Sequence, residues 1–323
     1  MFFFLLFEFT VLLILILYHI PYAYLKKSHK DDNIYNMSVG CSIICPLYKA
    51  DKYIDLLVES LLKQKDVDIV EILFVLTDTG GGECEKIEAW QEKDKRIRYE
   101  TISEKVFSHS LTREKAARKA KGNVLVFITQ DIEIRDENWL VKLVAPIING
   151  EADASYSRQK TKYDNLEKYT RESNYPDKSF VVTEDDISKL GLKTFFFSDA
   201  AGAILKKKFI ELNGYDGKDL PISEDMYFAY KLIMSGGRIK YCADSIVYHS
   251  HDFSLKQIYD RYKLTGKFFK ENSYLDKYGT NNSGAKMAKH VLKRIVQEKR
   301  FMLLLRYPFD MGARFIGMKV GKK

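Results

Sequence analysis

The sequence predicts an α/β fold in which a mostly parallel β-sheet is flanked by helices. Short, mainly apolar runs, such as 39–46 and 123–128, alternate along the chain with amphipathic helical segments. Such runs are typical of strands that are buried on both faces, as they are between two helical layers. Asp78 and Asp131 each follow an apolar run, and sheets of this kind bind ligands at the carboxyl ends of their strands.

The first half of the chain supplies most of the predicted sheet. A strand over 39–46 ends at a proline, and the helix after it carries apolar residues spaced along one face: Ile54, Leu57, Val58, Leu61 and Leu62. Further strands are expected over 71–76, 96–101 and 123–128, and further helices over 83–91 and 112–120. This alternation is the pattern of successive β-α-β units.

The second half is less regular. A strand over 152–157, a helix over 163–171 and a run of small residues within 195–205 come first. A helix then begins at Ser223 and ends at Gly236-Gly237, because consecutive glycines terminate helices. The remaining predicted elements are two short strands within 238–249, helices over 255–270 and 285–300, and an amphipathic surface segment over 301–320.

Charge is distributed unevenly along the 323 residues. Residues 254–323 contain 17 Lys and Arg against 5 Asp and Glu, a net charge of +12, while the whole chain carries only +8. A basic C-terminal segment predicts contact with an anionic surface. The four cysteines form no C-x-x-C pair, which excludes a disulfide framework or a zinc knuckle and fits a reducing cytosol.

The N-terminal segment is expected to be a membrane anchor. Residues 2–20 are almost wholly apolar and, as a helix, would span roughly 28 Å, close to the thickness of a bilayer core. Three lysines follow within residues 26–30, which places the rest of the chain at the cytoplasmic face of the cell membrane, single-pass or peripheral. An alternative is that Met37 is the true start. The predicted segments are therefore 1–25 as an anchor, 38–270 as the main domain and 271–323 as a basic amphipathic tail.

Two groups of residues carry the predicted chemistry. Glu224 and Asp225 open a helix behind Ser223; they either serve as an ordinary N-cap with acids in the first turn, or provide a general base. Asp131 is either a turn residue or a ligand of Mg²⁺ or Mn²⁺, and His249 and His251 share one face of a strand end, where imidazoles hold Mn²⁺ or a diphosphate.

Two further positions are candidates for binding phosphate or ribose. Arg113 lies near the start of a helix, where it contacts an anion or is simply a surface arginine. The Gly80–Gly82 run lacks the third glycine of a dinucleotide fingerprint, because position 85 is Glu85, and it leaves Asp78 available to a ribose or base.

Several of these motifs together resemble family 2 glycosyltransferases of the GT-A fold, and among them bacterial rhamnosyltransferase-like enzymes of cell-surface polysaccharide synthesis. The resemblance rests on C-P-L-Y-K over 45–49, on 107–113, on 122–131 ending in T-Q-D, on Glu224-Asp225 and on His249. Relatives usually have Asn at Lys49 and an acid at Thr129, and their strand-2 acid lies one position before Asp78.

The resemblance implies an inverting transfer of a sugar to an acceptor hydroxyl. Asp225, with Glu224 beside it, would be the catalytic base, and Asp131 with His249 would hold Mg²⁺ or Mn²⁺. The implied donor contacts are Pro46, Tyr48, Asp78, Arg113 and Gln130. The implied partners are a nucleotide-sugar, dTDP-rhamnose or a UDP-sugar, a glycan or lipid-linked acceptor, and a membrane surface, with no nucleic acid. Two alternatives remain: a metal-dependent phosphohydrolase of nucleotide-sugars, and a non-catalytic membrane scaffold with the same fold.

Overall fold

A computed structural model describes residues 39–323, apart from the side chains of residues 280–283. The predicted membrane anchor over 1–25 therefore lies outside the described residues. Among residues 39–323, no helix combines the length and apolar character that crossing a bilayer requires.

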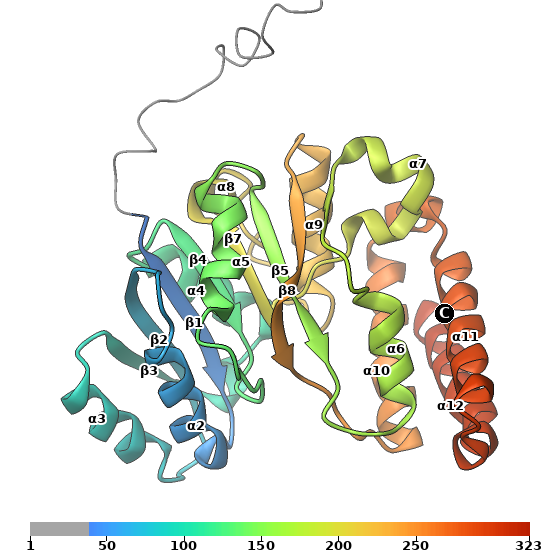
Figure 1. Ribbon diagram of the computed structural model, residues 1–323, viewed down its shortest axis with the longest axis horizontal. Helices are drawn as coiled ribbons and strands as arrows, with labels where there is room; N and C mark the ends of the chain where they lie inside the picture. The colour runs from blue at the N-terminus through green and yellow to red at the C-terminus, as the bar shows by residue number, and fades with distance from the viewer. Residues whose placement is uncertain (1–38) are drawn as a thin grey trace, which may run out of the picture. The chain divides into compact units, whose positions relative to one another are not determined.

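Eight strands form one sheet in the order β3-β2-β1-β4-β7-β5-β8-β6 (Figure 1). Their bounds are β1 (Cys41–Leu47), β2 (Ile69–Asp78), β3 (Ile97–Ser103), β4 (Val124–Ile128), β5 (Ala154–Lys160), β6 (Phe180–Val182), β7 (Ala201–Leu205) and β8 (Ile239–Tyr248). The strands β3, β2, β1 and β4 pair in parallel, as do β5 and β8, whereas β7 is antiparallel to both of its neighbours and β6 is antiparallel to β8. The predicted mostly parallel α/β sheet is confirmed.

The prediction of two short strands within 238–249 is wrong, because β8 is a single strand. Its pairing with β5 shifts register between Ser157 and Arg158, whose partners are Cys242 and Ile246. The residues between those partners form an irregularity in a continuous strand. The turn-like composition A-D-S of these residues is the feature that imitates a break between strands.

Helices cover both faces of the sheet and continue into a C-terminal group. Their bounds are α2 (Asp51–Leu62), α3 (Glu83–Lys93), α4 (His109–Lys119), α5 (Trp139–Ile148), α6 (Leu166–Asn174), α7 (Ile187–Leu190), α8 (Lys206–Glu211), α9 (Glu224–Met234), α10 (Leu255–Glu271), α11 (Thr280–Gln297) and α12 (Phe301–Lys322). Short 3₁₀ turns lie at η1 (Glu104–Val106), η2 (Glu184–Asp186), η3 (Gly191–Phe195) and η4 (Ser273–Tyr278). Helix α4 starts three residues before the predicted 112, since Ser108 caps it by accepting a hydrogen bond from the Leu111 amide at 3.3 Å.

Two apolar layers enclose the sheet. Along β1, Ile43 packs into the layer under α2, α3 and α5, and the next residue, Ile44, packs into the layer under α4, α8 and α9. Successive side chains of a strand point to opposite faces, so a strand buried on both faces is mostly apolar. This arrangement is the physical origin of the continuous apolar runs in the sequence.

One edge of the sheet collects the chemically active residues. The parallel strands β1 and β4 end there at Leu47 and Ile128, and β8 ends there before His249. Because β7 is antiparallel to β4, its first residue, Ala201, pairs with Ile128. The segment 198–200 before β7 therefore reaches the same edge.

Candidate active site

A cavity of about 950 Å³ opens at this edge of the sheet. Eight of the predicted site residues line it: Pro46, Tyr48, Arg113, Gln130, Asp131, Glu224, Asp225 and His249. Asp78, the ninth, is not among the lining residues, and its carboxylate accepts a hydrogen bond from the Gly80 amide at 3.0 Å. Thr77, one residue earlier, lines the cavity instead, because adjacent strand residues point to opposite sides.

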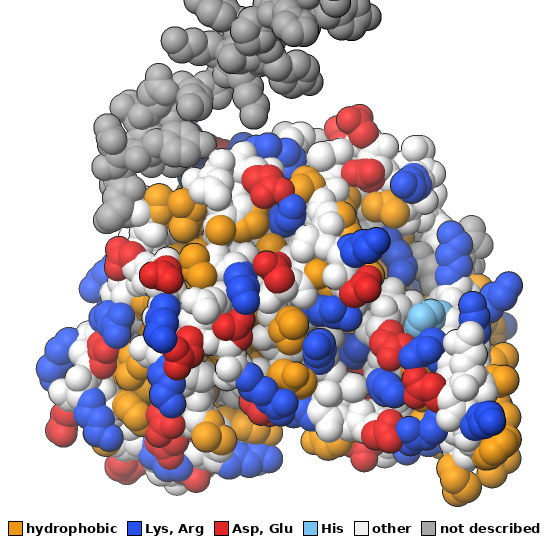
Figure 2. Space-filling model, in the orientation of Figure 1, with side chains coloured by type: hydrophobic (Ala, Val, Ile, Leu, Met, Phe, Trp, Pro, Cys, Tyr) orange, Lys and Arg blue, Asp and Glu red, His pale blue; other side chains and the backbone are white. Residues whose placement is uncertain are grey.

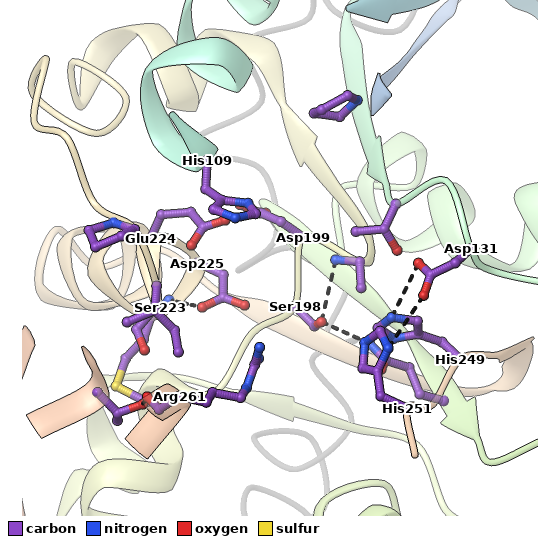
Figure 3. Close-up of a pocket in the computed structure, with 18 of the residues that line it drawn as sticks. His109, Asp131, Ser198, Asp199, Ser223, Glu224, Asp225, His249, His251 and Arg261 are labelled. Carbon is purple, nitrogen blue, oxygen red and sulfur yellow. Dashed lines mark hydrogen bonds and ion pairs between the residues drawn. The ribbon is translucent and has the colours of Figure 1, made fainter. Parts of the chain in front are cut away.

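The acidic pair at the start of α9 is held by a strained turn rather than by a normal cap. Ser223 has a left-handed backbone with φ of +61°, and its side chain forms no capping hydrogen bond. The expectation of an ordinary serine N-cap is therefore wrong. Strained, non-glycine left-handed residues are common where a loop must aim a functional side chain. Here the turn directs Glu224 and Asp225 into the cavity (Figure 3).

The two acids of the pair have different surroundings. Glu224 is buried and forms an ion pair with Arg113 at 3.1 Å between Oε1 and Nη1. Asp225 accepts a hydrogen bond from the Met226 amide at 2.7 Å. Burial raises the pKa of Asp225 well above its ordinary value, the carboxylates of Glu224 and Asp199 raise it further, and Arg113 partly offsets this. A carboxylate with a raised pKa is a stronger base than an exposed one.

Arg113 is the buried centre of this acidic group. The alternative that it is a surface arginine is wrong, since only 3% of the residue is exposed. Its Nη1 also donates to the His109 carbonyl at 3.0 Å, and its buried Nε has no hydrogen-bond partner among the described residues. A buried guanidinium beside several acids is stable only because each compensates the other.

Asp199 belongs to the same group and was not identified from the sequence. It is buried, it lines the cavity, and its Oδ2 accepts a 2.5 Å hydrogen bond from the Tyr215 hydroxyl. Its Oδ1 has no hydrogen-bond partner among the described residues. Burial raises the pKa of Asp199 to about 7 against the opposing effect of Arg113. The signal in the sequence was the S-D-A-A-G run, read there only as small residues.

A second cluster joins the ends of β4 and β8. Asp131 Oδ1 lies 3.5 Å from His249 Nε2, and Asp131 Oδ2 lies 3.7 Å from His251 Nδ1 (Figure 3). One ligand atom from each of the three residues lies within 4.8 Å of the others. A carboxylate and two imidazoles at this spacing match the donor set of a divalent cation.

The protonation states at this cluster fit a cation. Burial lowers the pKa of both histidines, that of His249 well below its ordinary value, which favours the neutral imidazoles that bind a cation. His249 Nδ1 lies 3.0 Å from Gln159 Oε1 and, as the protonated nitrogen, donates to that oxygen. This assignment leaves a lone pair on Nε2 facing the Asp131 carboxylate, so two hydrogen-bond acceptors face each other, as they do when both bind a cation. Histidines that bind a metal through one ring nitrogen usually donate a hydrogen bond from the other.

The loops after β1 and β4 are locked together. The Gln130 side chain accepts from the Tyr48 amide at 2.7 Å and donates to the Tyr48 carbonyl at 2.9 Å. Lys49 next to it is left-handed, with φ of +48°. Asparagine tolerates this conformation better than lysine does.

Two threonines present buried hydroxyls at this edge. Thr77 and Thr129 both line the cavity, and each has a buried hydroxyl without a hydrogen-bond partner among the described residues. Buried hydroxyls are normally paired, so these two are available to a bound molecule. Several residues of α6, α10 and α12 also line the cavity without having been predicted: Arg171, Arg261, Tyr262 and Arg314.

The sequence matches a known family over most of this architecture. A model for Glycosyl transferase family 2 matches residues 42–212, more than half of the chain. The O-antigen chain rhamnosyltransferase RfbN of Salmonella typhimurium (strain LT2) is 32% identical over 233 residues, or 71% of this chain and 74% of the relative. The O-antigen chain rhamnosyltransferase WbaN of Salmonella anatum is 30% identical over 68% of this chain and 71% of its own length.

Solved structures share the fold at low identity. The mannosyltransferase PcManGT from Pyrobaculum calidifontis, in complex with GDP-Man and Mn²⁺, has a TM-score of 0.61 and 15% identity over 89% of this chain and 88% of that one. Residues 1–349 of S. aureus TarS, in complex with UDP-GlcNAc, give a TM-score of 0.52 and 17% identity over 87% and 90%. The expected GT-A fold is thus confirmed. The chain belongs to glycosyl transferase family 2 and is a glycosyltransferase.

Proposed function

We propose that this protein is an inverting rhamnosyltransferase that moves the sugar from a nucleoside diphosphate donor to a hydroxyl of a lipid-linked glycan in cell-surface polysaccharide synthesis. The observation that carries the proposal is the placement of a carboxylate pair and a cation-type cluster in one cavity (Figure 3). The two rhamnosyltransferase relatives support the choice of sugar and of the polysaccharide.

In this proposal, Asp225 accepts the proton of the acceptor hydroxyl as that oxygen attacks the anomeric carbon. Figure 3 shows Glu224 and Asp225 on one side of the cavity and Asp131 with the histidines on the other, with Ser198 and Asp199 between them. An in-line displacement needs the base and the leaving group on opposite sides of the sugar. Glu224 is a positioning residue because its ion pair with Arg113 occupies it.

The leaving diphosphate is assigned to the opposite side. Asp131, His249 and His251 would hold a divalent cation, which when bound stabilises the negative charge on the departing nucleoside diphosphate. Two imidazoles favour Mn²⁺ over Mg²⁺, because Mg²⁺ prefers oxygen ligands and an almost ideal octahedron. Pro46, Tyr48, Thr77 and Thr129 are proposed to contact the nucleotide.

The membrane partner is also part of the proposal. It is supported by the net charge of +12 over residues 254–323, which suits anionic lipid headgroups at the cytoplasmic face. A lipid-linked acceptor at that face would reach the enzyme by lateral diffusion in the membrane.

The donor is tested with a panel of nucleotide-sugars. We expect dTDP-rhamnose, among dTDP-, UDP- and GDP-sugars, to raise the melting temperature most in the presence of Mn²⁺. Turnover should require a glycan acceptor. Release of phosphate, or of a sugar phosphate with a nucleoside monophosphate, without any acceptor would favour the phosphohydrolase. No turnover with any acceptor or donor would favour the scaffold.

The metal ligands give a second prediction. Asp131→Ala should lose the Mn²⁺-dependent part of nucleoside diphosphate affinity, at least about tenfold. The measurement is calorimetry of nucleoside diphosphate binding with and without Mn²⁺, and Asp136→Ala is the matched control because Asp136 pairs with Lys142 at the surface. Equal affinity of the unaltered protein in both conditions would remove the cation from the proposal.

The threonine near the end of β2, Thr77, gives a third prediction. Thr77→Val should weaken nucleotide binding by about tenfold, because the bound nucleotide loses a hydrogen bond to a desolvated hydroxyl. Asp78→Asn, one residue later and pointing away from the cavity, should leave the affinity unchanged. The reverse pattern would restore Asp78 as the nucleotide contact.

A further inference from the structure

Helix α12 is amphipathic, but its apolar side faces solvent and its polar side faces the protein, the reverse of the usual arrangement. Its apolar side chains face solvent, and six of them are more than half exposed: Phe301, Met302, Leu305, Phe309, Phe315 and Ile316. With 100° between successive residues, these side chains fall on one side of the helix. Figure 2 shows hydrophobic side chains gathered at the edge of the molecule where Figure 1 places α11 and α12. We call these six residues the α12 apolar face.

The opposite side of α12 is fixed against α10 by glycines. An added Cβ on Gly317 would lie 2.5 Å from the Tyr259 carbonyl oxygen, and one on Gly321 would overlap the Lys263 carbonyl. On α10, a Cβ on Gly266 would overlap the Met318 carbonyl oxygen. The two backbones are thus in direct contact, an arrangement that only glycine permits. Rotation of α12 to bury its apolar face would destroy this contact.

Charged residues occupy the inward side as well. Asp310 is buried and accepts a 2.5 Å hydrogen bond from Arg314 Nε. Arg314 also donates to the Tyr262 hydroxyl at 2.7 Å, and Arg306 donates to the Phe253 carbonyl at 2.8 Å. Burying paired charges while exposing Phe and Leu is costly in water. The arrangement is favourable only where the outward side meets an apolar medium.

We propose that the α12 apolar face inserts into the acyl region of an anionic lipid leaflet, with α12 lying in the plane of the membrane. A helix with apolar residues on one outward side and basic residues at its ends is the form of an interfacial membrane helix. The basic residues Lys299, Lys319 and Lys323 lie at the two ends of α12 and complement anionic headgroups, whereas Arg300 and Lys322 pair with Asp164 and Asp276. A second copy of this chain would instead bring two strongly basic C-terminal segments together.

The position of α12 connects this surface to the cavity. Arg314 lines the cavity from α12, and Tyr262 lines it from α10, while the α12 apolar face points away from both. Here the inference rests on the proposed function: a lipid-linked acceptor would keep its tail in the leaflet under α12 and extend its glycan to the cavity. Membrane insertion itself does not depend on the transferase reaction.

The test adds one tryptophan at a time to the full chain and subtracts the fluorescence of the unaltered protein, which comes from its native Trp90 and Trp139. Phe309→Trp places an indole in the α12 apolar face, and Leu56→Trp, at the exposed Leu56 of α2, is the matched control. Both variants are mixed with vesicles of phosphatidylcholine and phosphatidylglycerol whose acyl chains carry bromine, which quenches indoles within the apolar layer. Relative to the unaltered protein, we expect a blue shift and strong quenching of the added indole in Phe309→Trp and neither in Leu56→Trp, at low and high salt alike.

Each other result overturns the proposal. Vesicle binding without quenching at position 309 would mean that another part of the chain holds the membrane. A blue shift in buffer that grows with protein concentration, together with a doubled mass in light scattering, would make α12 a dimer interface. A concentration-independent blue shift in buffer would mean that the chain's own first 38 residues cover α12. Sugar transfer from donor to acceptor is measured in the same samples. A failure of the proposed transferase function is thereby distinguished from a failure of membrane insertion.

Discussion

Asp225→Asn is expected to reduce sugar transfer by about 10²- to 10⁴-fold while folding and nucleotide binding stay nearly intact. Asparagine keeps the shape of the side chain and the hydrogen bond from the Met226 amide, but it cannot accept the acceptor's proton. Steady-state rates with a saturating donor measure the effect, and calorimetry with nucleoside diphosphate measures binding. The affinity must remain, since Asp225 lies across the cavity from the cation-type cluster.

The pH profile gives an independent test of the same residue. Burial and the neighbouring acids raise the pKa of Asp225, so the base is protonated and inactive at low pH and becomes active as the pH rises. The acid limb of kcat/KM is therefore expected well above 3.8, the ordinary value of an aspartate. Glu224→Gln removes a negative charge beside Asp225 and frees Arg113, and both changes lower the pKa of Asp225.

Glu224→Gln is thus the control that separates the two acids. We expect it to shift the acid limb to lower pH and to retain more turnover than Asp225→Asn does. If Glu224→Gln abolishes transfer and Asp225→Asn keeps almost normal turnover, the assignment of the base within the pair is reversed.

The fold was predictable because its strongest signals are local. A strand buried on both faces is mostly apolar, so β1 and β4 were visible in the sequence, and the positions of Asp131 and His249 followed from strand ends. The A-D-S irregularity in β8 could not be predicted from the sequence, since a bulge within a strand and a break between two strands have the same composition.

The site was only partly predictable because some of it depends on strand direction and register. Asp199 comes before a strand, where a parallel sheet would place it far from the site, and only the antiparallel direction of β7 brings it to the cavity. A shift of one residue decides that Thr77 rather than Asp78 points inward. The inward glycines and arginines of α12 become recognisable only once α10 is in place.

Arg113→Met is expected to lower the free energy of unfolding by about 3–5 kcal/mol, because it leaves buried carboxylates without their cation. Methionine keeps most of the apolar volume, so the loss reports on charge rather than on a cavity. Lys119→Met is the matched control on the same helix, since Lys119 pairs with Glu100 at the surface and such pairs contribute at most about 1 kcal/mol. Urea denaturation followed by circular dichroism measures both variants.

The pH dependence of this loss identifies its cause. A carboxyl whose pKa is raised by folding favours the protonated form, so it lowers stability as the pH rises from its ordinary value to its folded value. For Asp199 this window runs from 3.8 to about 7 in the unaltered protein, where Arg113 opposes the rise. Without Arg113 the window extends to higher pH, so the deficit of Arg113→Met should be larger at about pH 8 than at about pH 5. A deficit that is the same at both pH values would mean that Arg113 does not oppose the rise in the pKa of Asp199.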